Sequence, residues 1–377
     1  MKTEHQTFWR VANKLSLLAL LAILTGKFAQ AETITIGKGS GIVWEGMPFN
    51  VTNRVPTTTP NFPNPDLYAY SSVAYIVPTG VTTSQCIPES ALTVIAGYKA
   101  FKIAPGVGII PRATISADYV LANGNPETLS GTIGLPSTQG NTSGGAIITN
   151  PLMGGSWCLA PRMSSVANFY KPSTYINATA TGTWVMVADG TQKKQDNISL
   201  TNVNFTTSGN GYVGFSPIFA RNMTLRISTL ECTVNTPVQI NFGAVAKNIQ
   251  SGAELGSQTN VLTTYCSQDS ASEINANINV QFRALTGLYQ GSPTRLSLSQ
   301  GGGYITGEID RGVTGSGSCT GSNGVPFDNT LLKIGNITSA QTTQNTTNQI
   351  TWRLCSGGSS LPVGNVDASA EMLVTFN

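Results

Sequence analysis

The chain has 377 residues, of which only 10% are charged and 40% are hydrophobic. This composition excludes a disordered polyelectrolyte, because disorder needs high charge and low apolarity. The single histidine, His5, lies in a segment that we expect to be removed, so Ser-His-Asp or Cys-His catalysis and zinc held by histidine are excluded.

The first residues are typical of a secretory targeting signal. Lys2, Arg10 and Lys14 form a positive segment ahead of an apolar run of ten residues, Leu15–Leu24. Such a run is too short to span a membrane, which takes about 20 apolar residues. The small residues of Ala29–Ala31 predict cleavage after residue 31, with an uncleaved anchor as the alternative. We therefore expect residues 1–31 to be a signal peptide and the rest to be exported.

Cleavage changes the charge balance of the chain. It removes four basic residues and one acidic residue, so the exported part carries as many basic as acidic side chains. No basic stripe or basic-aromatic run appears in it. The sequence therefore indicates no nucleic-acid partner.

Short strand patterns separated by Gly, Pro, Asn and Ser dominate the exported part, and sustained helical periodicity is almost absent. Such a pattern favours an all-β fold built of sandwiches. Asn53–Pro65 is too rich in proline for a central strand and is expected to form a surface loop. The clearest strand signals are Ile34–Ile36, Leu92–Ile95, Gly182–Val187 and Ile198–Phe205.

All six cysteines lie in the exported part, where an oxidising compartment favours disulfides. Six cysteines allow 15 pairings, and the sequence alone does not choose among them. Their wide spacing, without a CxxC, argues against a thiolate metal site or a redox motif, and we expect no metal and no cofactor. Sequential pairing, the simplest arrangement for two domains, gives Cys86–Cys158, Cys232–Cys266 and Cys319–Cys355.

The amino-acid composition and the strand pattern change near residue 216. Ser208–Ser216 is polar and rich in glycine, and the strand-like Met223–Ser228 follows it. We therefore expect a first domain over residues 32–216 and a second over residues 217–377.

The second domain carries the strongest motif. Met223–Val245 predicts an alternating strand that reaches Cys232, a short turn, and a second alternating strand that ends in NFGAV, with Cys266 about 20 residues later. The chain ends in Asp367–Asn377, another alternating strand. One face of that strand is apolar and consists of Ala368, Ala370, Met372, Val374 and Phe376. Together these features resemble the pilin subunits of chaperone–usher fimbriae.

The resemblance implies an immunoglobulin-like sandwich that lacks its last strand. Residues 367–377 would then form one wall of an apolar groove, which a periplasmic chaperone fills before an outer-membrane usher exchanges it for the next fimbrial subunit. An ordinary last strand of a complete sandwich is the alternative. Because a whole domain precedes the pilin-like part, the chain resembles a two-domain tip adhesin made of two immunoglobulin-like sandwiches. Its first domain would face outward at the fimbrial tip, on the bacterial surface.

The first domain contains GGSWCLAP over Gly154–Pro161, and the strand-like Gly106–Ile110 lies upstream. These features resemble the N-acetylglucosamine-binding fimbrial lectins, in which a tryptophan–cysteine pair lies at a shallow sugar site. The resemblance implies a host-surface glycan as the ligand. The site residues that it suggests are Asp118, Trp157, Ser164 and Ser165, and the chemistry of sugar binding adds Asn123.

The chemistry of sugar binding adds further candidates, because hydroxyls bind carboxylates and amides while the ring face stacks on aromatic side chains. Asn168 could join the polar set. Trp157 could instead pack over the Cys86–Cys158 bridge, and Asp118 could cap a loop. The alternatives at the level of function are an adhesin for a host matrix protein and a structural minor pilin; thinly spread acids argue against a glycosidase. Further aromatic candidates are Trp44, Tyr68, Tyr70 and Tyr75.

Overall fold

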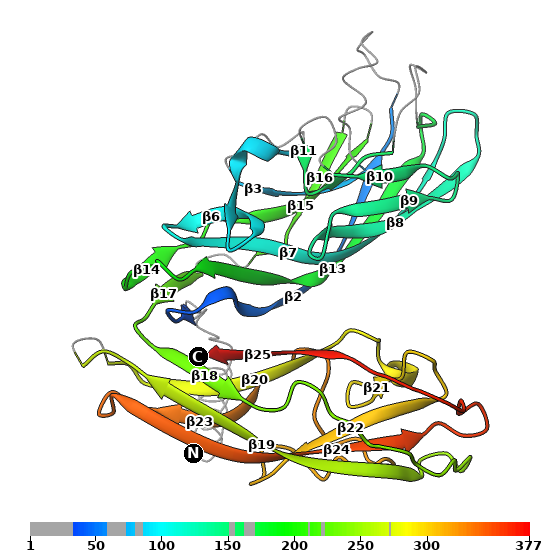
Figure 1. The fold of residues 1–377 in the computed structure, drawn as a ribbon. Helices are drawn as coiled ribbons and strands as arrows, with labels where there is room; N and C mark the ends of the chain where they lie inside the picture. The colour runs from blue at the N-terminus through cyan, green and yellow to red at the C-terminus, as the bar shows by residue number, and fades with distance from the viewer. Residues whose placement is uncertain are drawn as a thin grey trace, which may run out of the picture. The chain divides into compact units, whose positions relative to one another are not determined.

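The computed structural model describes residues 33–58, 73–79, 86–150, 155–161, 170–209, 212–219, 223–270 and 273–377. These residues form an all-β fold, which confirms the expected class (Figure 1). Their only helical turns are two short 3-10 segments, Glu89–Ala91 and Tyr289–Gly291, and no helix among them is long and apolar enough to cross a membrane. The expected signal peptide lies outside the described residues.

The first sandwich packs an eight-stranded sheet against a four-stranded one. A two-stranded ribbon, β4 (Ile87–Pro88) with β11 (Gly155–Ser156), adjoins them. The larger sheet contains β2 (Ser40–Pro56), β5 (Leu92–Ile95), β6 (Tyr98–Ala104), β7 (Val107–Val120), β8 (Pro126–Gly134), β9 (Gln139–Thr142), β10 (Ile147–Thr149) and β13 (Tyr175–Asp189). The smaller sheet contains β3 (Ala74–Pro78), β12 (Cys158–Leu159), β15 (Val203–Gly209) and β16 (Tyr212–Pro217).

Alternation along the long strands builds the core of the first sandwich. In β7, Ile115, Ala117 and Tyr119 point inward while the residues between them are exposed, as a period of two requires. Trp184 on β13 lies at the centre, where its indole N–H donates to Ile218 O at 2.9 Å and its ring meets Phe219 edge-on. Three of the four clearest strand predictions are confirmed: Ile34–Ile36 lies in β1 (Thr33–Ile36), Leu92–Ile95 is β5, and Gly182–Val187 lies in β13.

Two expectations about the first half need correction. Asn53–Pro56 is not loop but the end of β2, because Asn53 and Val55 turn inward and Asn53 bonds the neighbouring sheet. Residues 59–65 of the expected loop lie outside the described part. Ile198–Phe205 is not one strand: β14 (Gln195–Ser199) and β15 belong to different sheets, and the chain passes between them at residues 200–202.

The second sandwich pairs a five-stranded sheet with one end of a six-stranded sheet. The five strands are β18 (Glu231–Asn235), β19 (Glu254–Ser267), β21 (Leu296–Ser297), β22 (Gly303–Ile309) and β24 (Thr343–Ser356). The other sheet runs in the order β14, β17 (Thr224–Ile227), β1 (Thr33–Ile36), β25 (Ala370–Phe376), β20 (Ala276–Ala284) and β23 (Leu332–Ile337). Its last three strands cover the core of the second sandwich.

The division between the two cores falls later than residue 216. Ile218, Phe219, Leu225 and Ile227 all belong to the first hydrophobic core, whereas Leu230 belongs to the second. We therefore place the proposed division between residues 227 and 230. The described cysteines form the three sequential disulfides: Cys86–Cys158 in the first sandwich, and Cys232–Cys266 and Cys319–Cys355 in the second.

Candidate functional site

The last strand, β25, is paired along only one of its edges. Its neighbour β20 runs antiparallel to it in unbroken register from Ala370 to Phe376. Among the described residues, the opposite edge meets a strand only where Thr35 of β1 lies opposite Phe376. The edge between Ala370 and Val374 has no strand partner in the described structure.

The hydrogen-bond pattern shows which backbone groups of β25 face this open edge. Asn277 and Asn377 exchange both backbone bonds, and Leu285 N donates to Ser369 O, so the odd-numbered residues bond to β20. Because bonded and non-bonded positions alternate in an antiparallel pair, the N–H and C=O groups of Ala370, Met372 and Val374 point away from β20. Three donors and three acceptors are therefore presented at the open edge.

The same three residues turn their side chains toward the core of the second sandwich. Ala370, Met372 and Val374 pack against that core, as Ala368 does, yet they stay only half-buried, whereas Phe376 beside β1 is buried. The strand begins at Ala370, later than the expected Asp367, and the residues of the expected apolar face pack on this core. The apolar side chains of β25 therefore lie on the core, but no strand of the described chain covers them along the open edge.

A second unpaired stretch follows β18. Residues 236–250 form no strand, so the alternating strand expected up to Val245 is wrong. Its side chains are mostly exposed: Val238 is fully so, and Ile249 is 59% exposed. Phe242 packs against the second core, and both Phe242 and Val245 lie next to Gly256 of β19. The local pattern suits a strand, but the described chain supplies no neighbour to hydrogen-bond with it.

The other face of β25 carries a charged cluster. Glu371 accepts hydrogen bonds from Arg283 of β20 and, at 3.0 Å, from Arg112 of β7 in the first sandwich. Arg112 also faces Glu45 of β2 at 3.6 Å. Glu45 is only 3% exposed and accepts further bonds from Thr183 and from Asn329. We name Glu45, Arg112, Arg283 and Glu371 the ionic cluster.

The ionic cluster predicts a pH dependence of stability. Burial raises the pKa of the Glu371 carboxyl, but the hydrogen bonds from Arg283 and Arg112 outweigh it, so the net pKa lies below its usual value. In the unfolded chain the pKa of this carboxyl is about 4.3. Because the folded pKa is lower, the ionised Glu371 stabilises the fold at pH values above about 4.3, and this stability is lost as the pH falls through the folded pKa. We expect Glu371→Gln to lower the urea midpoint of unfolding at neutral pH. Near pH 3 the midpoints of the variant and the parent should lie closer together. Urea unfolding at both pH values measures this, with the exposed Glu231→Gln as the control; an equal difference at both would contradict it.

The candidate receptor residues of the first sandwich are only partly brought together. Asp118 lies exposed on β7 and accepts a hydrogen bond from Asn177 Nδ2 of β13 at 2.7 Å. Opposite Asn177 on β2 lies Arg54, whose guanidinium stacks 3.9 Å from the ring centre of Tyr175. Arg54, Asn177 and Asp118 therefore form one exposed cross-strand row, which ends at Thr128 of β8.

Trp157 does not offer an open platform, because it is 3% exposed and packs in the first core. Tyr75 is also buried, with its hydroxyl 3.0 Å from that of Ser208, and burial raises its pKa to about 12. Trp44 is half-buried against the same core. Asn123 is exposed in the turn after β7, where its Oδ1 accepts from Asn125 N. Five other candidates lie outside the described residues: Tyr68, Tyr70, Ser164, Ser165 and Asn168.

Sequence reasoning missed Tyr175, which is 46% exposed and carries the stacked Arg54. Its exposed position in β13, an alternating strand, is the signal that could have found it. The pair joins an aromatic face to a cation and lies next to the Asp118 row. Arg54 covers one face of this ring, and the rest of the exposed Tyr175 side chain lies beside the row.

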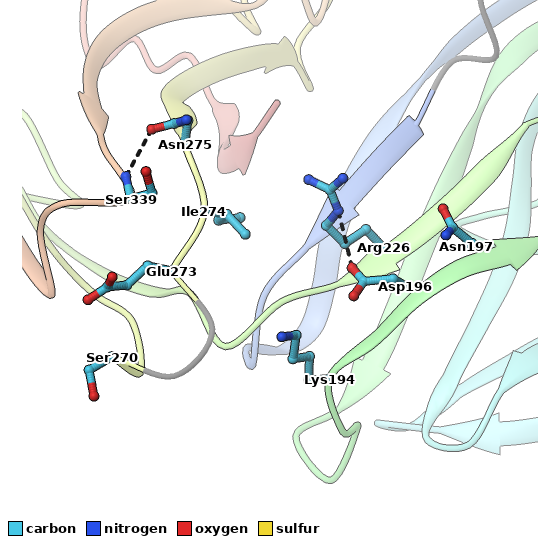
Figure 2. A pocket seen from close by; sticks show the side chains of 9 residues that line it. All are labelled: Lys194, Asp196, Asn197, Arg226, Ser270, Glu273, Ile274, Asn275 and Ser339. Atoms are coloured by element: carbon cyan, nitrogen blue, oxygen red, sulfur yellow. Dashed lines mark hydrogen bonds and ion pairs between the residues drawn. The ribbon is translucent and has the colours of Figure 1, made fainter.

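An open cleft of about 680 Å³ lies elsewhere, between β14 and β17 on one side and Ser270, residues 273–275 and Ser339 on the other (Figure 2). Arg226 pairs with Asp196 at 3.4 Å, and Asn275 accepts from Ser339 N. Two basic and two acidic side chains line the cleft, namely Lys194, Arg226, Asp196 and Glu273, so its lining carries no net charge. No group of three metal-ligating side chains occurs among the described residues.

No known family model matches the chain, and no curated protein matches it. Solved structures that are similar to it in part include the following two. The crystal structure of the CupB6 tip adhesin from Pseudomonas aeruginosa is 13% identical, covers 92% of this chain and 87% of its own, and has a TM-score of 0.29. A chaperone–tip adhesin complex of CFA/I fimbriae is 10% identical, covers 92% of this chain and 95% of its own, and has a TM-score of 0.24. At these TM-scores, the likenesses assign no role to any residue of this chain.

Proposed function

We propose that the chain is a fimbrial tip adhesin. Its second sandwich joins a fibre by accepting a strand at the open edge of β25, and its first sandwich binds a host-surface glycan. The observation that carries the proposal is the open edge itself, where Ala370, Met372 and Val374 present unpaired backbone groups beside a half-covered core. In this reading the second sandwich is a pilin domain.

An open edge above apolar side chains is a hazard, because it is a template for pairing with any other chain. Complementation by an added strand removes the hazard and uses main-chain hydrogen bonds for affinity. A periplasmic chaperone would supply the strand first, and after transfer through an outer-membrane usher the next subunit would replace it. Residues 236–250, which form no strand, are a second segment that we propose as a partner for an added strand.

The first sandwich fits a receptor-binding module. Its core is separate from that of the second, and its larger sheet has an exposed outer face of hydroxyls and amides. On this face Asp118 and Asn177 supply acceptors and donors, and Tyr175 supplies an aromatic plane. We propose that the sugar binds over this row, with Asn123 as a further polar partner. Ser164 and Ser165 stay candidates outside the described residues, and the buried Trp157 has no exposed face to offer. The proposed role is non-catalytic.

Glycan binding by the full chain should depend on Asp118. Asp118→Ala removes the exposed carboxylate, so we expect at least about a tenfold loss of binding on a glycan array, because charged hydrogen bonds are worth roughly 1.5–3 kcal/mol. Thermal stability should change little, since exposed positions cost within about 0.5 kcal/mol.

The exposed Asp196→Ala, which removes a carboxylate far along the sequence, is the matched control and should bind as the parent does. Unchanged binding by Asp118→Ala would show that the sugar site lies elsewhere. If the chain bound host matrix proteins but no glycan, the receptor would be a protein and the glycan hypothesis would be wrong.

A further inference from the structure

The strand β1 occupies the end position of the open edge of β25. It runs parallel to β17 through four register pairs, from Thr33 opposite Thr224 to Ile36 opposite Ile227. On its other side it meets β25 antiparallel, with Thr35 opposite Phe376. One short strand thus fills the last position of an edge that is otherwise free.

Strand β1 is firmly held in this position. Ile34 and Ile36 are buried in the first core. Ile36 O accepts from Ser228 N at 2.9 Å and from Ser228 Oγ at 3.0 Å, and the hydroxyls of Thr33 and Thr224 lie 2.9 Å apart. An incoming strand would have to break these contacts to take its place.

Immediately after β1, the chain turns away from β25. Lys38 N donates to Leu230 O at 3.1 Å, and Gln192 Nε2 donates to Gly37 O at 2.9 Å and to Gly39 O at 2.8 Å. A side chain on Gly37 would overlap Leu230 O and would lie 3.2 Å from the Phe376 ring. The backbone at Gly37 therefore lies between Leu230 and the Phe376 ring, and beyond Phe376 the described chain leaves the edge of β25 free.

We infer that β1 is a built-in stop that fixes the length and register of the complementing strand, which pairs with Ala370, Met372 and Val374 and ends before Phe376. The inference rests on the proposed strand-acceptor function. The partner is an extended segment of another chain with apolar side chains at alternate positions. Those side chains face the core beside Met372 and Val374, and the backbone bonds reach the three donors and three acceptors of the edge.

Synthetic probe strands of alternating Val and Thr test the stop on the full chain. A short probe spans Ala370–Val374, and a long probe would also reach Phe376 and beyond. We expect both to bind within about twofold of each other, because residues past Val374 find no partner; each added net hydrogen bond would otherwise tighten the Kd by about fivefold. Residue-resolved amide exchange should show new protection at Met372 and Val374, with no change at Thr35 and Ile36.

Binding of the long probe more than about tenfold tighter, with faster exchange at Thr35, would mean that β1 is displaced and would overturn the stop. Failure of both probes to bind would instead contradict the strand-acceptor function. The variant Thr35→Pro removes an amide donor from β1 and should let the long probe bind more tightly than the short one. If this variant does not fold, the comparison of probe lengths on the parent chain still decides.

Discussion

Deletion of residues 367–377 should abolish the cooperative folding of the second sandwich. The deletion removes β25, so β20 loses its partner from Ile278 to Ala284, and the core loses Phe376 together with the half-buried side chains before it. A strand that closes a core cannot be replaced by water without exposing both apolar surface and unpaired backbone groups. The truncated chain should aggregate or be degraded when it is exported. Urea unfolding followed through the two sandwiches, and recovery of soluble protein, measure the effect.

The single substitution Asn377→Ala, which keeps the strand, is the control for this deletion. Asn377 also bonds Asn279 by its side chain, so a small loss is expected and a large one is not. A truncated chain that is recovered as a stable monomer with an unchanged second transition would contradict the role of β25.

Arg112→Ala should be the most damaging single change in the ionic cluster, at about 3–5 kcal/mol, because removing one partner of a buried ion pair leaves an uncompensated charge. Glu45 is 3% exposed and Arg112 is 13% exposed, so the carboxylate left behind has little access to water. The loss should appear as a lower midpoint in denaturant unfolding at neutral pH.

Arg283→Ala is the matched control, since Arg283 bonds only Glu371 within the ionic cluster and is more exposed than Arg112. Glu371 keeps its bond from Arg112 in that variant, and we expect a loss near 1 kcal/mol. Equal losses for the two arginines would contradict the view that the buried Glu45 carboxylate dominates the cost.

Strands whose side chains alternate between apolar and polar could be predicted from the sequence. Alternation over residues 367–377 gives both the strand and the face that turns to the core, because a period of two is a property of the strand alone. Strand-like sequence also predicted β1, β5 and the buried start of β7. The order of the cysteines gave the disulfides once two domains were assumed, because each pair then closes within its own domain.

Features that depend on a distant partner could not be predicted. The alternating residues up to Val245 carry strand propensity, yet a strand also needs a neighbour, and the described chain offers none there. Trp157 beside Cys158 suits a sugar site or a core equally well by sequence, and only packing shows it to be buried. Nothing in the sequence joins Arg112 to Glu371, which are 259 residues apart, or places Thr35 beside Phe376.

Residue-resolved amide exchange along β25 in the free full-length chain tests the central claim most directly. The odd-numbered residues Glu371, Leu373 and Thr375 bond to β20 and serve as internal controls for Met372 and Val374 on the same strand. An open edge predicts slow exchange at the three odd positions and exchange close to that of an unstructured chain at Met372 and Val374. Equal protection at all five positions would show that the sandwich is already complete and would contradict a strand-acceptor function.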